Sequence, residues 1–381
     1  MLIIMFFCVI LSANVNKMVF FMEKNVNAKE IEYSLNKNNL RNSIQQLYEE
    51  KEINNILKLI VFSRSLKFKG KGTVDSFPSD KDINEFLQEN ANLSIDDLNN
   101  LFQDYFLTDT MFGKVLIHDR RNVRIMERYS EELKTIFKEL GLWEGIDTTN
   151  KINNKITQIR ILGTNHIFAA ACLKDFKNKI IELKNNNLLS DDCKIILLTG
   201  DHKNKGFIDD DYTENKEFDL LFSEEFAGLK VENCVSEKKS LFKRANTIDT
   251  IIKADKEYPN DGNILYLGQP IILNRQRTDI FVHYKKNNQI EKFKNTYYYS
   301  SDFEKFKRNL SDNIIYDARS KESVFLNEHN PFKSKKLFYK RINKIMNKEL
   351  KLLELDYSLC LDSIARSNYA QIKSGFFLKN E

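Results

Sequence analysis

Apolar residues recur with two different periods along the chain, and the change between them lies near residue 156. Upstream, over residues 28–150, they are spaced three or four positions apart, as Ile53, Ile56 and Ile60 are. This is the period of a helix that buries one face. The sequence therefore predicts a helical segment in this region.

Between residues 156 and 286, short apolar runs alternate with stretches of helical period. The runs have the length and the branched side chains of strands covered on both faces, and they occupy residues 159–162, 195–198, 229–235 and 264–267. Strands that alternate with helices are typical of a parallel sheet with right-handed crossovers. The predicted fold class is therefore α/β, a Rossmann-like parallel sheet with helices on both faces. A further apolar run at 280–284 is expected to extend this sheet or to lie at its edge.

The two ends of the chain differ from this central domain. The last segment, 287–381, is charged, aromatic and mostly of helical period. For residues 1–21 two interpretations stay open. Residues 1–13 form either a signal peptide, which would make the protein exported, or a stretch upstream of a start at Met18 or Met22, which would make it cytoplasmic. This apolar run is shorter than the roughly 20 residues of a membrane-spanning helix, and no transmembrane helix is expected.

Composition narrows the class of protein. Hydrophobic residues make up 42% and aromatic residues 12% of the 381 residues, which indicates a globular chain long enough for more than one domain. The net charge of +5 comes from 59 basic and 54 acidic residues, so the surface is mixed and no nucleic-acid partner is expected. The 5 cysteines form no C-x-x-C pair, which predicts buried free thiols and neither a disulfide framework nor a zinc site.

Polar residues follow each predicted strand at the point where the strand ends. The carboxyl ends of parallel strands meet at one edge of a sheet, and this is where open α/β sheets bind ligands. The predicted ligand-binding residues are Gly163, Thr164, Asn165, Thr199, Gly200, Arg244, Asn246, Thr247, Asp249, Gln269 and Arg275. Helix N-termini and these polar side chains would bind phosphate or ribose. For each residue taken alone, a local role such as helix capping is the alternative.

Asp201 and His202 are the predicted general acid and base, because they place two titratable groups side by side at the end of a strand. Glu214 and Asp249 are predicted to orient the substrate or to bind a divalent cation. The sequence contains no P-loop, G-x-G-x-x-G or nucleophile elbow. It therefore leaves the reaction class open, with hydrolysis of a phosphate-containing substrate as the expectation for an enzyme.

The motifs of this region come in the order ILG, LLTGD, TENKEFDLL, ANTID and ILYLGQ. This order resembles that of the YdcF-like family, a domain family of unknown function, over about residues 157–277. The residues that match in type are Gly163, Thr199, Gly200, Glu214, Glu237, Ser240, Asn246, Thr247 and, approximately, Arg275. The resemblance implies a Rossmann-like fold, a nucleotide-type ligand such as S-adenosylmethionine and, in some members, association with the bacterial envelope.

The chain also departs from the family pattern. Asp201 stands where the family has a second glycine, and it places a negative charge where a phosphate would approach most easily. Further departures are Asp249, Thr250 and Gln269.

Two functional hypotheses follow. The first is an α/β protein that binds a nucleotide-type small molecule, either S-adenosylmethionine or a phosphate-containing ligand, as a binding protein or as a hydrolase. The second is a non-catalytic interaction protein that keeps the sheet as a scaffold and binds a protein partner through its helical flanks.

Overall fold

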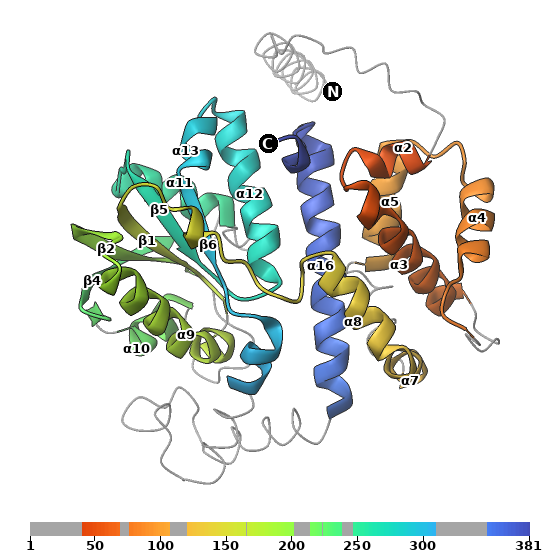
Figure 1. The fold of residues 1–381 in the computed structure, drawn as a ribbon, viewed down its shortest axis with the longest axis horizontal. Coiled ribbons are helices and arrows are strands. Elements are labelled where there is room, and N and C mark those ends of the chain that lie inside the picture. Colours follow the sequence, from red (N-terminus) through yellow and green to blue (C-terminus); the bar gives the residue numbers. More distant parts are fainter. Residues whose placement is uncertain are drawn as a thin grey trace, which may run out of the picture.

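The centre of the molecule is a six-stranded sheet in the order β3-β4-β2-β1-β5-β6 (Figure 1). The computed structural model describes residues 40–68, 76–106, 120–164, 166–201, 214–222, 224–237, 247–309 and 349–381. The strands are β1 (Ile156–Leu162), β2 (Leu189–Gly200), β3 (Glu225–Phe226), β4 (Leu229–Ser236), β5 (Asn263–Leu267) and β6 (Thr296–Tyr299). Neighbouring strands are parallel except β3 and β4, which pair antiparallel at one edge. The predicted α/β fold with a Rossmann-like parallel sheet is confirmed.

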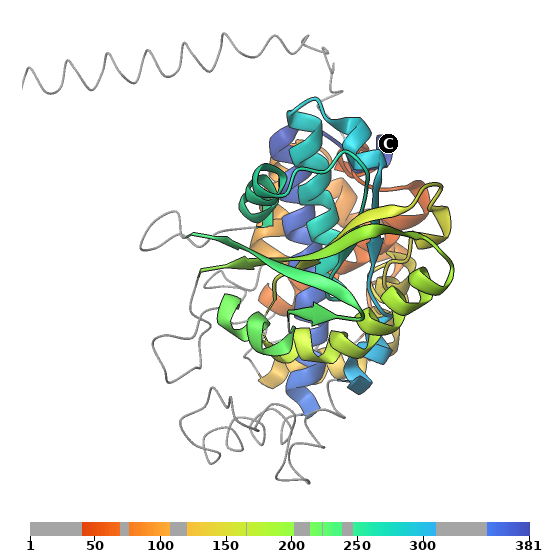
Figure 2. The ribbon, with the colours of Figure 1, turned by 90° about the vertical axis from the view of Figure 1, so that its left-hand side faces the viewer.

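Helices cover both faces of the sheet (Figure 2). One face carries α9 (His166–Asn185) and α10 (Glu214–Leu221), and the other carries α11 (Thr247–Glu257), α12 (Ile272–Lys286) and α13 (Ile290–Lys294). Successive side chains of a strand point to opposite faces. Accordingly, Ile195 and Leu197 of β2 pack in the hydrophobic core on the α9 and α10 side of the sheet, and Ile196 and Leu198 pack in the core on the other side. This two-sided burial explains why the strand is a continuous apolar run.

The order of the strands places a switch point beside β1. Along the chain, the parallel strands run outward from β1 through β2 to β4, and then continue on the other side of β1 with β5 and β6. The winding therefore reverses between β1 and β5. In open α/β sheets, ligands bind outside the carboxyl ends of the strands at this point. The fold thus favours a ligand site near Leu162 and Leu267, where β1 and β5 end.

The described helices upstream of residue 150 form a layer of their own, as the apolar period predicts. They are α2 (Leu40–Gln45), α3 (Glu50–Phe68), α4 (Asp80–Glu89), α5 (Ile95–Phe106), α7 (Arg120–Arg128) and α8 (Ser130–Glu139). The C-terminal helix α16 (Glu349–Ser374) lies between this layer and the α/β domain, with α5 on one side and α12 on the other (Figure 1). Short helical turns occur at Thr149–Lys151, 303–309 and Leu378–Asn380.

The apolar run at 280–284 is not a strand, and this prediction was wrong. It lies within α12, which packs against α11, α13 and α16 as well as the sheet. Ile280, Phe281 and Val282 are therefore all buried, and a helix buried on several sides has the same continuous apolar pattern as a buried strand. The sheet instead gains β6, so it extends beyond the predicted domain boundary at residue 286.

The cysteines in the described ranges are free thiols, and all of them are buried, which confirms their predicted state. They are Cys172, Cys193, Cys234 and Cys360. Cys8 and the two interpretations of residues 1–21 lie outside the described ranges. Among the helices that the structure describes, none has the length and apolarity needed to cross a membrane.

Candidate functional site

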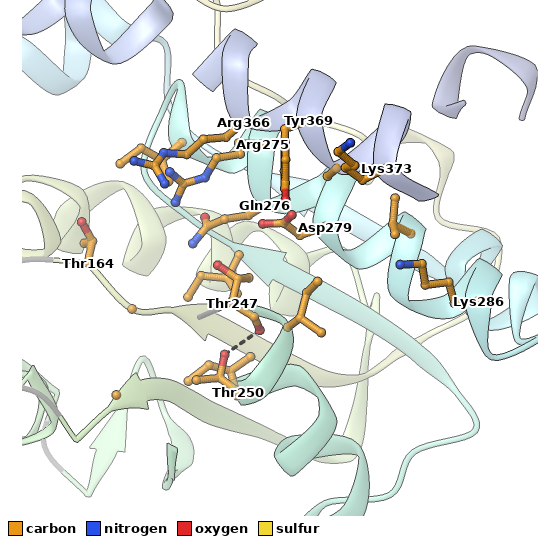
Figure 3. Close-up of a pocket in the computed structure, with 18 residues that line it drawn as sticks. Thr164, Thr247, Thr250, Arg275, Gln276, Asp279, Lys286, Arg366, Tyr369 and Lys373 are labelled. Carbon is orange, nitrogen blue, oxygen red and sulfur yellow. Dashed lines mark hydrogen bonds between the residues drawn. The ribbon is translucent and has the colours of Figure 1, made fainter. Parts of the chain in front are cut away.

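A cavity of about 780 Å³ lies beside the switch point of the sheet, at the carboxyl ends of β1 and β2. We call it the switch-point cleft. Its floor is formed by the ends of β1 and β2 and by the first turn of α11, and its opposite wall by α12 and α16 (Figure 3). The lining residues are Leu162, Gly163, Thr164, Leu198, Gly200, Thr247, Ile248, Thr250, Ile272, Arg275, Gln276, Asp279, Val282, Lys286, Arg366, Tyr369, Ala370 and Lys373.

After each of the four predicted strands, at least one of the predicted residues contributes to this cleft. Gly163 and Thr164 follow β1, Gly200 ends β2, Thr247 begins α11 and Arg275 lies in the first turn of α12. These residues are far apart in the sequence and meet because parallel strands end at one edge of the sheet. The sequence pattern therefore located the cleft through these five residues.

Other predicted residues lie beside the cleft without lining it. Gln269 is buried and accepts a hydrogen bond from the Thr164 hydroxyl, with 3.1 Å between Thr164 Oγ1 and Gln269 Oε1. Thr199 is buried, and its hydroxyl donates to Asn215 Oδ1 at 3.1 Å, so it fixes α10 against β2. Asp201 is exposed directly after β2, and Asp249 lies in the first turn of α11.

The predicted acid and base are not tested by the described geometry. Asn165, His202, Arg244 and Asn246 lie outside the described residues. Glu214 begins α10, but its side chain is not among those described. The catalytic assignments therefore stay predictions.

The wall formed by α12 and α16 supplies residues that the sequence analysis missed. From α16 these are Arg366, Tyr369 and Lys373, and from α12 they include Asp279 and Lys286. Residues three and four positions apart share one face of a helix. The spacing of the α16 residues shows such a polar face in the sequence, but only the tertiary fold brings this helix over the sheet.

The lining of the cleft is predominantly basic. Its charged residues are Arg275, Lys286, Arg366 and Lys373 on the basic side and Asp279 on the acidic side. The two guanidinium groups lie side by side at one end of the cleft, whereas the two amines lie towards the other end (Figure 3). An anionic ligand would therefore meet positive charge at both ends.

Asp362 on α16 holds the two guanidinium groups together. Its Oδ2 atom lies 2.7 Å from Arg366 Nε and 3.5 Å from Arg275 Nη1. One carboxylate thus lies against both guanidinium groups and fixes their positions at this end of the cleft. Arg donors of this kind suit bidentate binding of phosphate or carboxylate groups.

Asp279 lies in the middle of the cleft wall, next to Gln276 and Tyr369 (Figure 3). Burial raises the pKa of Asp279 to about 6, although the nearby Arg275 and Arg366 act in the opposite direction. A carboxyl group with this pKa is ionised at pH 7 at a cost in folding free energy.

The variant Asp279→Asn is expected to increase the free energy of unfolding at pH 7.5, by no more than about 3 kcal/mol. The raised pKa means that the folded protein holds this proton more tightly than the unfolded chain does. Stability from this group is therefore present at low pH and is lost as the pH rises through about 6. Urea unfolding of both proteins at pH 4.5 and pH 7.5 measures the effect. A difference that is absent at pH 7.5, or equal at both pH values, would contradict it.

The described residues include no group of three or more His, Cys, Asp or Glu side chains that could hold a metal ion. Among the residues that the structure describes, the polar groups that the cleft offers to a ligand are its charged side chains, its hydroxyl groups and the first turn of α11. Comparison of the chain with protein-family models, with curated proteins and with solved structures finds no match.

Proposed function

We propose that this protein binds a phosphate-containing, nucleotide-type small molecule in the switch-point cleft. The observation that carries the proposal is the convergence of four basic side chains, from α12 and α16, on the carboxyl edge of the sheet. The first turn of α11 faces the same space through Thr247 and Ile248. Helix N-termini and arginine side chains are the groups that proteins most often use to bind phosphate.

The size of the cleft supports a ligand larger than a free anion. Its volume of about 780 Å³ falls in the range of small-molecule and cofactor sites, roughly 300–1,000 Å³. Apolar side chains such as Ile248, Ile272 and Val282 line it beside the basic ones. A ligand with one flat apolar part and one anionic part, as a nucleotide has, matches both kinds of lining.

The charge of the cleft favours a phosphate over S-adenosylmethionine, the other ligand that the YdcF-like resemblance implies. S-adenosylmethionine carries a sulfonium and an ammonium group against one carboxylate, so its net charge is positive. The four basic side chains of the lining outnumber the carboxylates around them, which are Asp279 in the lining, Asp362 between the two arginines and Asp96 beside Lys373. This balance favours a phosphate over a ligand of positive net charge.

Hydrolysis of the bound ligand is the catalytic part of the proposal. Asp201, one of the two predicted acid/base residues, directly follows Gly200, which lines the cleft, and this supports placing catalysis at the rim of the same site. In the alternative, a non-catalytic interaction protein, the helical flanks would bind a protein partner. The packing of α16 against both α12 and α5 supports the first hypothesis, because this flank completes the cleft and is covered within the chain.

A ligand panel tests the proposed function on the full chain. Nucleoside diphosphates and triphosphates are expected to raise the melting temperature and to bind measurably by calorimetry, whereas adenosine and S-adenosylmethionine are not. The affinity should fall as salt concentration rises, because the attraction is between charges. Release of phosphate measured in the same samples separates a hydrolase from a binding protein. Binding of S-adenosylmethionine in preference to every phosphate ligand would overturn the proposal, as would the absence of binding by any of them.

A further inference from the structure

A second cavity lies on the other side of the α12–α16 pair, where these helices meet the N-terminal helical layer (Figure 1). Its volume is about 320 Å³, and we call it the interhelical cavity. It is lined by Tyr48, Glu49 and Glu52 at the junction of α2 and α3, by Arg277 of α12, and by Asn368 of α16, among others. None of these residues lines the switch-point cleft.

Arg277 brings a positive charge to this cavity and is not ion-paired with a carboxylate of the described residues. Its guanidinium group lies over the ring of Tyr298, 5.6 Å from the ring centroid. Its Nε atom is buried and has no hydrogen-bond partner in the part of the chain that the structure describes. A cation that is partly withdrawn from water without a counter-charge costs free energy, and an anion would remove this cost.

Asn368 adds a second unsatisfied donor. Its side chain is 1% exposed, and its Oδ1 atom accepts a hydrogen bond from the Tyr48 hydroxyl at 2.9 Å. Burial raises the pKa of Tyr48, so this hydroxyl keeps its proton and holds the amide in place. The Nδ2 atom of Asn368 is buried without a partner among the described residues. Buried polar groups of this kind are normally satisfied by protein, water or a ligand.

Two residues of the lining therefore hold buried donors, Asn368 Nδ2 and Arg277 Nε, that lack an acceptor among the described residues. Asn368 Nδ2 and the Arg277 guanidinium match a carboxylate, which accepts several hydrogen bonds and carries the missing negative charge. Two carboxylates, Glu49 and Glu52, lie at the same cavity and would meet a positive group. Its volume of about 320 Å³ is at the lower end for small-molecule sites, which limits the ligand to a small metabolite.

We propose that the interhelical cavity binds a free amino acid, with the ligand carboxylate on Arg277 and Asn368 and the ligand ammonium group towards Glu49 and Glu52. This site is separate from the switch-point cleft and does not depend on the function proposed for it. The same two helices form a wall of both cavities, but on different faces: Arg275 of α12 faces the cleft and Arg277 faces the interhelical cavity.

The experiment measures binding of the proteinogenic amino acids, one at a time, to the full chain by thermal shift and calorimetry. Acetate and ethylamine serve as probes that carry only one of the two charges. At least one amino acid is expected to give a saturable shift, and each single-charge probe is expected to bind at least tenfold more weakly than it does.

Two variants locate the binding. Arg277→Gln is expected to weaken it at least tenfold. Asn368→Asp, which replaces the amide donor with a negatively charged acceptor facing the ligand carboxylate, is expected to abolish binding. The control is Arg124→Gln, an exposed arginine on α7, which should leave the affinity unchanged.

The proposal is overturned if no amino acid binds, or if acetate binds as tightly as the best amino acid. It is also overturned if Asn368→Asp folds and still binds with the original affinity. Because the probes and variants differ from those of the switch-point cleft, failure of one proposal does not imply failure of the other.

Discussion

Replacing Asp255 with Asn is expected to lower the free energy of unfolding by about 3–5 kcal/mol, the usual cost of breaking a buried ion pair from one side. Asp255 lies on α11 and faces Arg160, whose side chain is 0% exposed in the middle of β1. The distance between Arg160 Nη1 and Asp255 Oδ1 is 2.8 Å. The variant would leave the guanidinium group buried without this negative charge.

Asp255 and Arg160 make several contacts besides the ion pair between them. Lys292 Nζ lies 2.9 Å from Asp255 Oδ1, and His283 Nε2 lies 3.9 Å from Oδ2. Arg160 also donates to the Tyr266 hydroxyl at 3.0 Å and to Gln158 Oε1 at 2.6 Å. The carboxylate thus ties α11 to β1 and to the region where α12 and α13 meet. Its loss should weaken the packing of all these elements on one face of the sheet.

The same group makes the protein sensitive to acid. Burial by itself would raise the pKa of Asp255, but His283, Arg160 and Lys292 together hold it well below its usual range. A carboxyl group with a depressed pKa stabilises the fold above the pKa of the unfolded chain, about 4. This contribution is lost as the pH falls below that value. The stability difference between wild type and Asp255→Asn should therefore shrink in acid.

Urea unfolding at pH 7 and pH 3 measures these effects. The matched control is Asp261→Asn, an exposed aspartate, which should change stability by less than about 0.5 kcal/mol. A double variant, Arg160→Met with Asp255→Leu, should be more stable than Asp255→Leu alone, because it removes both buried charges. Additive effects of the two substitutions would show that the ion pair does not carry the stability assigned to it.

The sequence predicted the sheet because its strands are buried on both faces. Ile195 to Leu198 form a continuous apolar run because their side chains alternate between two hydrophobic cores, one on each face of the sheet. The same signal failed at 280–284, where a helix enclosed on several sides has an equally continuous pattern. It also missed β6, whose residues Thr296–Tyr299 are mostly tyrosine and lie at an edge of the sheet.

The candidate site was predictable in part. Gly163, Gly200 and Thr247 lie in the cleft. They could be predicted because the apolar period and the turn residues indicate where a strand ends and where the next helix begins. The residues of α16 were not predictable in the same way. Arg366 is 91 positions from Arg275 in the sequence, and no local pattern predicts that the last helix packs against α12. Each arginine lies within 3.5 Å of Asp362 only in the folded chain.

The pair of arginines around Asp362 should decide the affinity of the switch-point cleft. Replacing both Arg275 and Arg366 with Gln is expected to weaken binding of a nucleoside diphosphate by about 100-fold or more, since each charge-assisted hydrogen bond contributes about 1.5–3 kcal/mol. The dependence of the affinity on salt should also become shallower, because fewer charges attract the ligand. Calorimetry at two salt concentrations measures both effects.

Substitution of Asp362 is expected to change the affinity in the opposite direction. The double arginine variant leaves this carboxylate, whose side chain is 13% exposed, without two of its partners, and the protein could lose affinity simply by losing its fold. Asp362→Asn removes the charge that competes with a ligand for both guanidinium groups. It is expected to bind the same nucleoside diphosphate several-fold more tightly, and a fold defect would not produce this gain.

An exposed arginine, Arg308, gives the matched control for the single variant Arg366→Gln, since Arg308→Gln also removes one positive charge but lies outside the cleft. If Arg308→Gln weakened binding as much as Arg366→Gln, the attraction would come from the overall charge and not from the cleft. If Asp362→Asn weakened binding as well, the three side chains would act as a structural cluster that shapes α12 and α16. Only opposite effects of the arginine and aspartate variants, with no effect of the control, fit a phosphate bound directly by Arg275 and Arg366.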